Sequence, residues 1–160
     1  MNKYDFIKSD VFMLLAENRF RNSKDFYEEH KNEIKQKVIL PMRQIAGIIS
    51  QDLIKLDEKM NLNPVKMVSR IRRDTRFSKD KTLYRENVWV MFMRPKNEHN
   101  TFPCMWFEIQ PGCYSYGIGI YNSKPRFMEY YRDEILKNPD EFLSAVNKAK
   151  KVGTKFIDNQ

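Results

Sequence analysis

The chain has 160 residues and a formal net charge of +8; 41% of its residues are hydrophobic and 31% are charged. This balance is that of a soluble globular protein, and the length predicts a single domain over residues 1–160. A membrane-spanning protein and a disulfide scaffold are excluded, because the apolar runs are short and only two cysteines occur.

Helices are predicted in the N-terminal third of the chain. Ser9 or Asp10 can cap a first short helix, and Asn22 or Ser23 can cap a second. Apolar residues of the second helix recur every three or four positions and form one stripe, namely Phe26, His30, Ile34, Val38, Met42, Ile45, Ile49 and Leu53. Pro41 lies within this stripe and has no backbone N–H, so we expect a kink or a break there.

Strands are predicted in the middle of the chain. Residues 67–72 can form one strand. Residues 88–93 are apolar at both odd and even positions, which is typical of a central strand whose two faces are both covered. Residues 103–110 and 113–121 alternate between apolar and other side chains. Pro111-Gly112 between them is a turn pair, so these two segments predict a β-hairpin.

The length of the hairpin loop decides its register. A two- or four-residue loop pairs Phe107 with Tyr116 on an apolar face, whereas a three-residue loop would break this parity. In the first register the other face carries Trp106, Glu108 and Gln110 opposite Ser115, Gly117 and Gly119. This face is either a groove that admits a ligand close to the sheet or a surface on which the helix 125–137 packs.

Two further helices are predicted after the hairpin. They begin at Pro125 and Pro139, because proline is well tolerated in the first turn of a helix. Helices followed by strands and then by helices predict an α+β fold with N-terminal helices, a central and mostly antiparallel sheet, and C-terminal helices.

The positive charge is concentrated in residues 66–85, called here the basic segment. It holds eight Lys and Arg against two Asp, a net charge of +6. Like charges repel and cost stability unless an anion lies near. Arginine suits phosphate and carboxylate because its planar guanidinium binds two oxygens at once. We therefore predict a ligand-binding site for a small anion, formed by Arg70, Arg72, Arg73, Arg76, Ser78, Lys79, Lys81 and Trp106.

Four residues are candidates for a catalytic role beside this site, namely Asp74, Asp80, Tyr84 and Glu108. An aspartate could act as a base if its surroundings raised its pKa, and a tyrosine could donate to an oxyanion. These residues leave open whether the protein is an enzyme. We also expect a pocket lined by Arg70, Arg72, Arg76 and Glu108. Alternation along the paired strands would place all four side chains on the polar face of the sheet.

The alternative is a structural role for the same charges. Asp74 and Asp80 can pair with neighbouring cations and fasten residues 75–82 to the sheet, with Phe77 as an apolar anchor. Three classes of function therefore remain: a domain that binds a small anion, a module that binds nucleic acid weakly, and a structural or interaction protein with an internal network of ion pairs.

Other features exclude further classes. The sequence has no HExxH, no paired CxxC and no GxxxxGK[ST], so we predict no metal and no cofactor. The N-terminus lacks an apolar signal core, and Cys104 and Cys113 have no CxxC spacing. We therefore expect a cytoplasmic protein without a membrane partner. The sequence does not indicate an oligomeric state.

The run RIRRDTRFSKDKTLY, Arg70–Tyr84, resembles the signature of the family called domain of unknown function 2461. Residues 14–26 and 106–119 resemble the family's N-terminal helices and hairpin, although Asp25 and Leu83 stand where tryptophan and proline are usual. Members of the family usually continue past the last helix, so we expect a short or truncated member. The resemblance implies a fold and no established activity.

Overall fold

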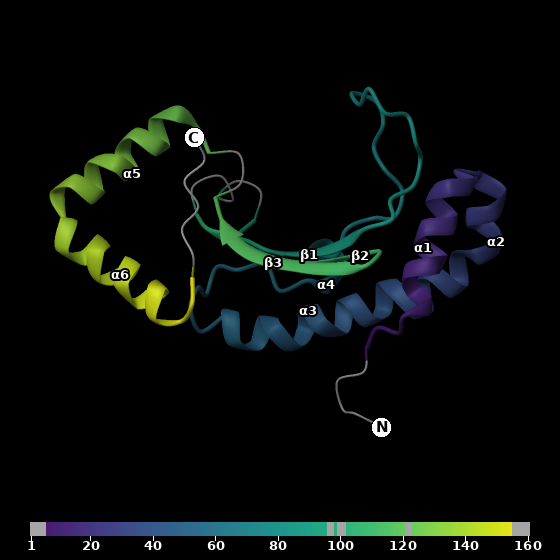
Figure 1. The fold of residues 1–160 in the computed structure, drawn as a ribbon, viewed down its shortest axis with the longest axis horizontal. Helices are drawn as coiled ribbons and strands as arrows, with labels where there is room; N and C mark the ends of the chain where they lie inside the picture. The colour runs from purple at the N-terminus through teal and green to yellow at the C-terminus, as the bar shows by residue number, and fades with distance from the viewer. Residues whose placement is uncertain (1–5, 96–97, 99–101, 121–122, 155–160) are drawn as a thin grey trace. The chain divides into compact units, whose positions relative to one another are not determined.

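The computed structural model describes residues 6–95, 98, 102–120 and 123–154 (Figure 1). The chain forms two compact units, Met1–Tyr121 and Asn122–Gln160, and each is described by itself. The first unit contains helices and an antiparallel sheet, and the second contains two helices. This confirms the predicted α+β class with helices at both ends of the chain. The single domain over residues 1–160 stays a prediction.

The N-terminal helices begin where the sequence predicts. Helix α1 (Asp10–Arg21) ends at Asn22, whose φ of 47° is left-handed. Helix α2 (Lys24–Ile34) is capped by Ser23, whose hydroxyl accepts a hydrogen bond from the backbone N–H of Phe26 at 3.4 Å. The cap satisfies a donor that the first turn of a helix leaves free.

The interruption predicted at Pro41 takes the form of a π-helical turn. The turn η1 (Lys35–Ile39) joins α2 to α3 (Leu40–Leu53), and Pro41 lies in the first turn of α3. Proline donates no hydrogen bond and its ring crowds the preceding turn. A π turn, whose hydrogen bonds span one residue more, is a known local irregularity of α-helices. Ile34, Val38 and Met42 are nevertheless all buried.

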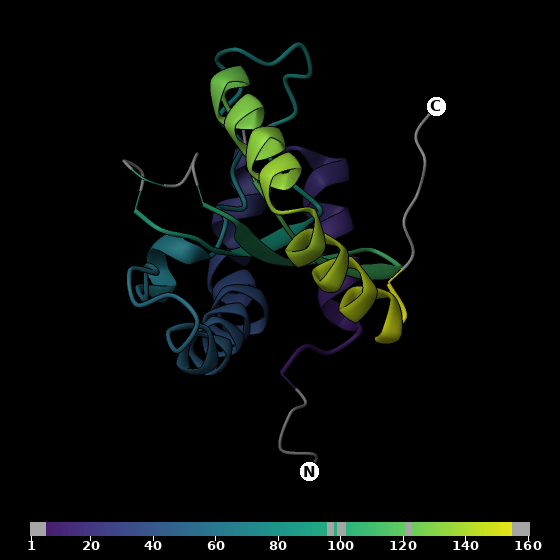
Figure 2. The same ribbon diagram turned by 90° about the vertical axis from the view of Figure 1, so that its left-hand side faces the viewer.

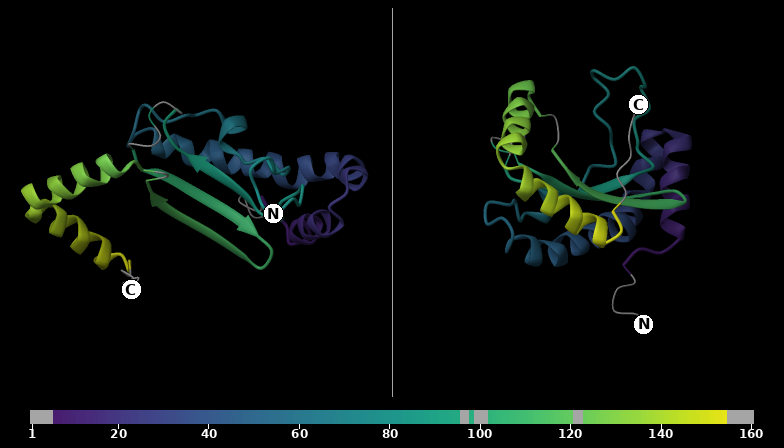
Figure 3. Two further views of the ribbon diagram at one scale, coloured as in Figure 1. Left: turned by 90° about the horizontal axis from the view of Figure 1, so that it is seen from above. Right: turned by 60° about the vertical axis from the view of Figure 1, so that its left-hand side comes forward.

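The sheet has three antiparallel strands in the order β1 (Val88–Phe92), β2 (Cys104–Gln110) and β3 (Cys113–Gly119). Figure 3 shows them side by side. Phe107 pairs with Tyr116 and Trp106 with Gly117, so the predicted hairpin register is confirmed. Gly112 has a φ of 82°, a conformation that glycine adopts without strain.

Two strand predictions are wrong. Residues 88–93 do not form the central strand; β1 is an edge of the three-stranded sheet, and its burial alternates. Residues 67–72 form no regular strand. Asn63 accepts from the backbone N–H of Val65 and starts the short helix α4 (Pro64–Met67), which uses the residues that would begin the strand. Only isolated bridges join the following residues to the chain at Val90 and Tyr84.

The core of the first unit lies between the sheet and the helices. Helix α3 packs against β1 and runs along one face of the sheet (Figure 1). The most deeply buried side chains come from both layers: Val11, Leu15, Ile34, Val38, Met42, Tyr84, Val88 and Val90. Tyr84 stacks on Tyr27 of α2 with ring centroids 4.7 Å apart. This packing fixes the C-terminal end of the basic segment against the helices.

The second unit consists of helices α5 (Pro125–Lys137) and α6 (Pro139–Lys151), which meet at Asn138 (Figure 2). Both begin at the prolines that the sequence singled out. Of the helices in the described part of the chain, none has both the length and the apolar character needed to span a bilayer.

Candidate functional site

The basic segment folds back on itself as a short two-stranded ribbon, residues 71–73 and 83–85. The backbone N–H of Arg73 donates to the carbonyl of Leu83 at 2.7 Å, and that of Arg85 donates to Ile71 at 2.9 Å. The loop between the two strands projects from the sheet near α1 (Figure 1). Successive side chains of an extended strand point to opposite sides, so Arg72 and Arg73 have different surroundings.

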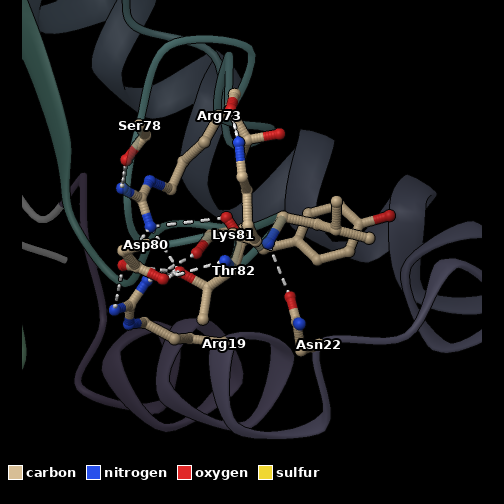
Figure 4. Close-up of polar contacts among 10 residues, drawn as sticks. Arg19, Asn22, Arg73, Ser78, Asp80, Lys81 and Thr82 are labelled. Atoms are coloured by element: carbon tan, nitrogen blue, oxygen red, sulfur yellow. Dashed lines mark hydrogen bonds and ion pairs between the residues drawn. The ribbon is translucent and has the colours of Figure 1, made fainter.

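On one side, a polar network fastens the loop to α1 (Figure 4). Its members, called here the Asp80 network, are Arg19, Arg73, Ser78, Asp80 and Thr82. Arg73 donates to the carboxylate of Asp80 and to the hydroxyl of Thr82. Arg19 donates to the same hydroxyl at 2.9 Å and to the carbonyl of Tyr84 at 3.0 Å. The network thus joins two arginines to one carboxylate.

The two aspartates of the basic segment both accept hydrogen bonds. The N–H and hydroxyl of Thr82, with Arg73, hold the pKa of Asp80 below its ordinary value. Arg76 donates to both oxygens of Asp74, at 2.9 and 2.6 Å, and lowers the pKa of Asp74 to about 2. A base near neutral pH needs a raised pKa. Both pKa values are lowered instead. This agrees with the alternative that Asp74 and Asp80 pair with neighbouring cations and fasten the loop.

Phe77 does not anchor the loop, contrary to the prediction. Its side chain is 95% exposed, and the Arg76 guanidinium lies 5.8 Å from its ring centroid. The Asp80 network fastens the loop through polar contacts, so no buried apolar residue is needed there. Lys79 is exposed at the same tip, and Lys81 donates to the carbonyl of Thr75 at 2.9 Å, not to an aspartate.

A cavity of about 960 Å³, called here the large cavity, lies on the side of the ribbon opposite the Asp80 network. Its lining comes from α2, η1, α3, the segment 61–72 and residues 93–95, and comprises Tyr27, Ile39, Arg43, Asn61, Val65, Lys66, Val68, Ser69, Arg70, Ile71, Arg72, Met93, Arg94 and Pro95. Apolar and basic residues predominate, and no Asp or Glu is among the described residues that line it.

The lining cations of the large cavity are mostly unpaired. Arg94 is held by Asp57 at 2.7 Å and by Glu98 at 3.1 Å. Within the described residues, by contrast, no hydrogen bond or ion pair reaches the side chains of Arg43, Lys66, Arg70 and Arg72. The Nε atom of Arg43 is also buried and has no acceptor. A buried donor without an acceptor is costly, so this arrangement favours an added anion.

A second, smaller pocket of about 250 Å³ lies beside the Asp80 network. It is lined by Arg19, Arg73, Asp80, Arg85, Glu86, Asn87 and Gln110. Sequence reasoning missed four arginines at these two sites, Arg19, Arg43, Arg85 and Arg94. The available signal was weak: Arg85 closes the basic segment, whereas Arg19 and Arg43 are single cations on helices.

The structure separates the residues predicted to share one pocket. Arg70 and Arg72 line the large cavity, whereas Arg76 lies on the exposed loop. Glu108 accepts a hydrogen bond from the side chain of Asn87, which lines the small pocket. The expected pocket of Arg70, Arg72, Arg76 and Glu108 is therefore wrong, because the ribbon and its loop direct these side chains apart.

Of the two alternatives for the face over Gly117, the ligand groove does not fit the structure at this residue. The ring of Trp106 lies over Gly117, and a Cβ atom placed on that glycine would overlap the ring. The missing side chain makes room for Trp106 itself. Tyr84, the remaining candidate, is 1% exposed, and burial raises its pKa. It therefore stays protonated at neutral pH, and its burial leaves little access for an oxyanion to which it was expected to donate.

These features describe an α+β domain with a divided cluster of arginines. Residues 10–160 match the family described as Conserved hypothetical protein (DUF2461), and the chain belongs to this family. The match confirms the resemblance drawn from the run Arg70–Tyr84. No curated protein and no solved structure matches the chain. The family's description states no activity, so a function has to be argued from the cavities.

Proposed function

We propose that this domain binds a small organic anion, bearing a phosphate or a carboxylate, in the large cavity. The observation that carries the proposal is a set of cations without a partner among the described residues: Arg43, Lys66, Arg70 and Arg72 border one cavity, and no carboxylate in the described part of the chain lines it. Such a group repels itself, and the protein is less stable for it unless an anion enters. Arginine forms paired hydrogen bonds with both kinds of anionic group.

The position of the acidic residues supports this choice of cavity. Asp80 and Asp74 pair with Arg73 and Arg76, so these arginines contribute little free charge. The excess charge of the basic segment is therefore greatest at Arg70 and Arg72. These two residues belong to the ligand-binding set proposed from the sequence.

The rest of the lining indicates a ligand with an apolar part. Tyr27, Ile39, Val65, Val68 and Met93 give the large cavity an extensive apolar wall. Its volume of about 960 Å³ falls in the range typical of small-molecule sites, which are mostly apolar with a few placed polar groups. An organic anion satisfies both requirements, because its body contacts the apolar wall and its charged group meets the arginines.

Thermal unfolding with model ligands tests the proposal. Phenyl phosphate and benzoate should raise the Tm of the parent protein, and the uncharged benzyl alcohol should not. A ligand at 100 times its Kd stabilises by about 2.7 kcal/mol, an effect that melts resolve easily. Arg43→Met and Arg72→Met should abolish the increase. Arg76→Met is the matched control, because Arg76 lies outside the cavity and should leave the increase intact.

Two results would contradict the proposal. One is a parent protein whose Tm neither anion changes. The other is an increase that persists in both Arg43→Met and Arg72→Met, since the anion would then bind elsewhere.

A second candidate function rests on the exposed loop. Phe77 is 95% exposed and stands between Arg76 and Lys79, a combination that can stack on a base and contact phosphates. This favours weak binding of single-stranded nucleic acid. The few cations at the tip, one of them paired with Asp74, predict low affinity that falls with added salt.

A further inference from the structure

Arg85 has an unusual environment on the side of the ribbon away from the large cavity. It is half-buried, and its guanidinium lies over the Trp89 ring, 4.7 Å from the centroid. Its Nε is buried and has no hydrogen-bond acceptor among the described residues. Burial and repulsion by Arg73 lower the pKa of Arg85, yet arginine keeps its charge at neutral pH. The charged Arg85 guanidinium is thus partly desolvated and has no hydrogen-bond partner among the described residues.

The described residues that line the small pocket around Arg85 are all polar or charged. Arg19 and Arg73 are held in place by the Asp80 network, so their guanidinium groups reach the pocket in a fixed position. Asn87 and Gln110 add side-chain amides; one N–H of Asn87 donates to Glu108 and one of Gln110 to the Cys113 sulfur, which leaves each amide one further donor. At about 250 Å³ the pocket is much smaller than the large cavity and has no apolar wall.

The balance of charge in the small pocket leaves room for an anion. Three arginines line it, but Asp80 pairs with Arg19 and Arg73, so Arg85 is the lining arginine whose charge is not already neutralised. The oxygens of Asp80 already accept from Arg19, Arg73 and Thr82, and Glu86 is exposed to solvent. Glu108 attracts Arg85 but makes no ion pair with it; its carboxylate accepts from Asn87.

We propose that the small pocket binds one small tetrahedral oxyanion, held by Arg85 together with the remaining amide N–H donors of Asn87 and Gln110. The class includes inorganic phosphate, sulfate and the phosphate group of a small phosphomonoester. The polar lining and small volume fit such an ion, which has no apolar body to bury. The site is separate from the large cavity and does not depend on what the large cavity binds.

Titration of the full chain with sodium phosphate, followed by NMR, tests this site. The Nε–H resonance of Arg85 and the indole N–H of Trp89 should shift in the parent protein. Arg85→Met should weaken phosphate binding about 10- to 100-fold, because a hydrogen bond to a charged group is worth about 1.5–3 kcal/mol. Arg21→Met is the matched control, since Arg21 is an exposed arginine that lines neither pocket and its replacement should leave phosphate binding at Arg85 unchanged.

Glu108→Gln gives a test in the opposite direction. It removes the nearby negative charge and keeps an oxygen for Asn87, so phosphate should bind more tightly, by a few-fold. Titration with sodium sulfate and with glycerol phosphate then distinguishes a free oxyanion from a phosphomonoester as the better occupant.

Three results would overturn the proposal. The first is that phosphate shifts neither resonance in the parent. The second is that Arg85→Met, or Arg85→Lys if the first variant fails to fold, binds phosphate as tightly as the parent. The third is that Glu108→Gln weakens binding, because Glu108 would then support the ion and not compete with it.

Discussion

Arg72 and Arg73 are neighbours in the sequence, yet their side chains meet opposite surroundings. Arg73 is held by Asp80, Thr82 and Ser78, and its charge is largely neutralised. Arg72 borders the large cavity and has no side-chain partner among the described residues. A high net charge therefore does not show which cations of a segment are available. The positions of a few carboxylates determine which cations are free to bind a ligand.

Arg73 in the Asp80 network and Arg72 at the large cavity should differ most in how much each contributes to the stability of the fold. Arg73→Met should lower the free energy of unfolding measurably, because charged hydrogen bonds to Asp80 and Thr82 are lost together. Arg72→Met, the control on the other side, should change it by less than about 0.5 kcal/mol. Urea unfolding with equal m-values measures both. Equal losses for the two variants would remove the distinction between the sides.

Acid should weaken the ion pairs of the basic segment, whose aspartates accept from arginine. The pKa of Asp74 is lowered from 3.8 to about 2 in the folded state by hydrogen bonds from Arg76. A lowered pKa stabilises the fold at pH values above the ordinary one, and this contribution is lost as the pH falls from about 4 towards 2. Asp74→Asn should therefore flatten the dependence of Tm on pH in that range. Arg70→Met should follow the parent curve, and a flattened curve for it would contradict the assignment.

The loop tip belongs to neither side, and its nucleic-acid binding can be tested alone. Phe77→Ala should weaken binding of a labelled single-stranded oligonucleotide about fivefold, roughly 1 kcal/mol, if a base stacks on the ring. Binding by the parent should fall steeply between two salt concentrations. Fluorescence anisotropy measures both effects. Tight, sequence-selective binding that survives physiological salt would rank nucleic acid above the small anion.

The smallest effect is expected from relieving repulsion at the large cavity. The double variant Arg70→Met/Arg72→Met should be as stable as the parent or more stable by about 0.5 kcal/mol at low salt. Added salt should remove the gain, because it screens like charges. Lys79→Met, which removes an exposed cation outside the cavity, should show no such gain. A destabilised double variant would mean that these arginines have structural partners.

Local signals in the sequence predicted much of the fold. Ser23, Pro125 and Pro139 start helices for reasons that act within one turn, and Pro111-Gly112 sets the register of the hairpin. The order of the strands could not be predicted in the same way. It depends on contacts between distant segments. The sequence pattern of an apolar strand such as 88–93 is the same whether the strand lies at the edge or at the centre of a sheet.

The candidate site was predicted in part, for a similar reason. The density of charge located the basic segment, and alternation along a strand separates Arg72 from Arg73. Arg43 and Arg19 lie far from that segment in the sequence and join it only in the folded chain. Phe77 was placed inside because aromatic residues usually are buried, and nothing local indicated that polar contacts would hold the loop without it.

The π turn η1 determines which residues of one long helix can face the large cavity. Tyr27 and Arg43 both line it and are 16 positions apart. In an uninterrupted α-helix, 16 steps of about 100° would leave the two side chains about 160° apart, on nearly opposite faces. The π turn absorbs about one residue, which brings that angle down to about 60°. Deleting a single residue from Lys35–Ile39 would leave 15 regular α-helical steps between the two side chains, again about 60°, so Arg43 should stay on the side of Tyr27 although the π turn is gone.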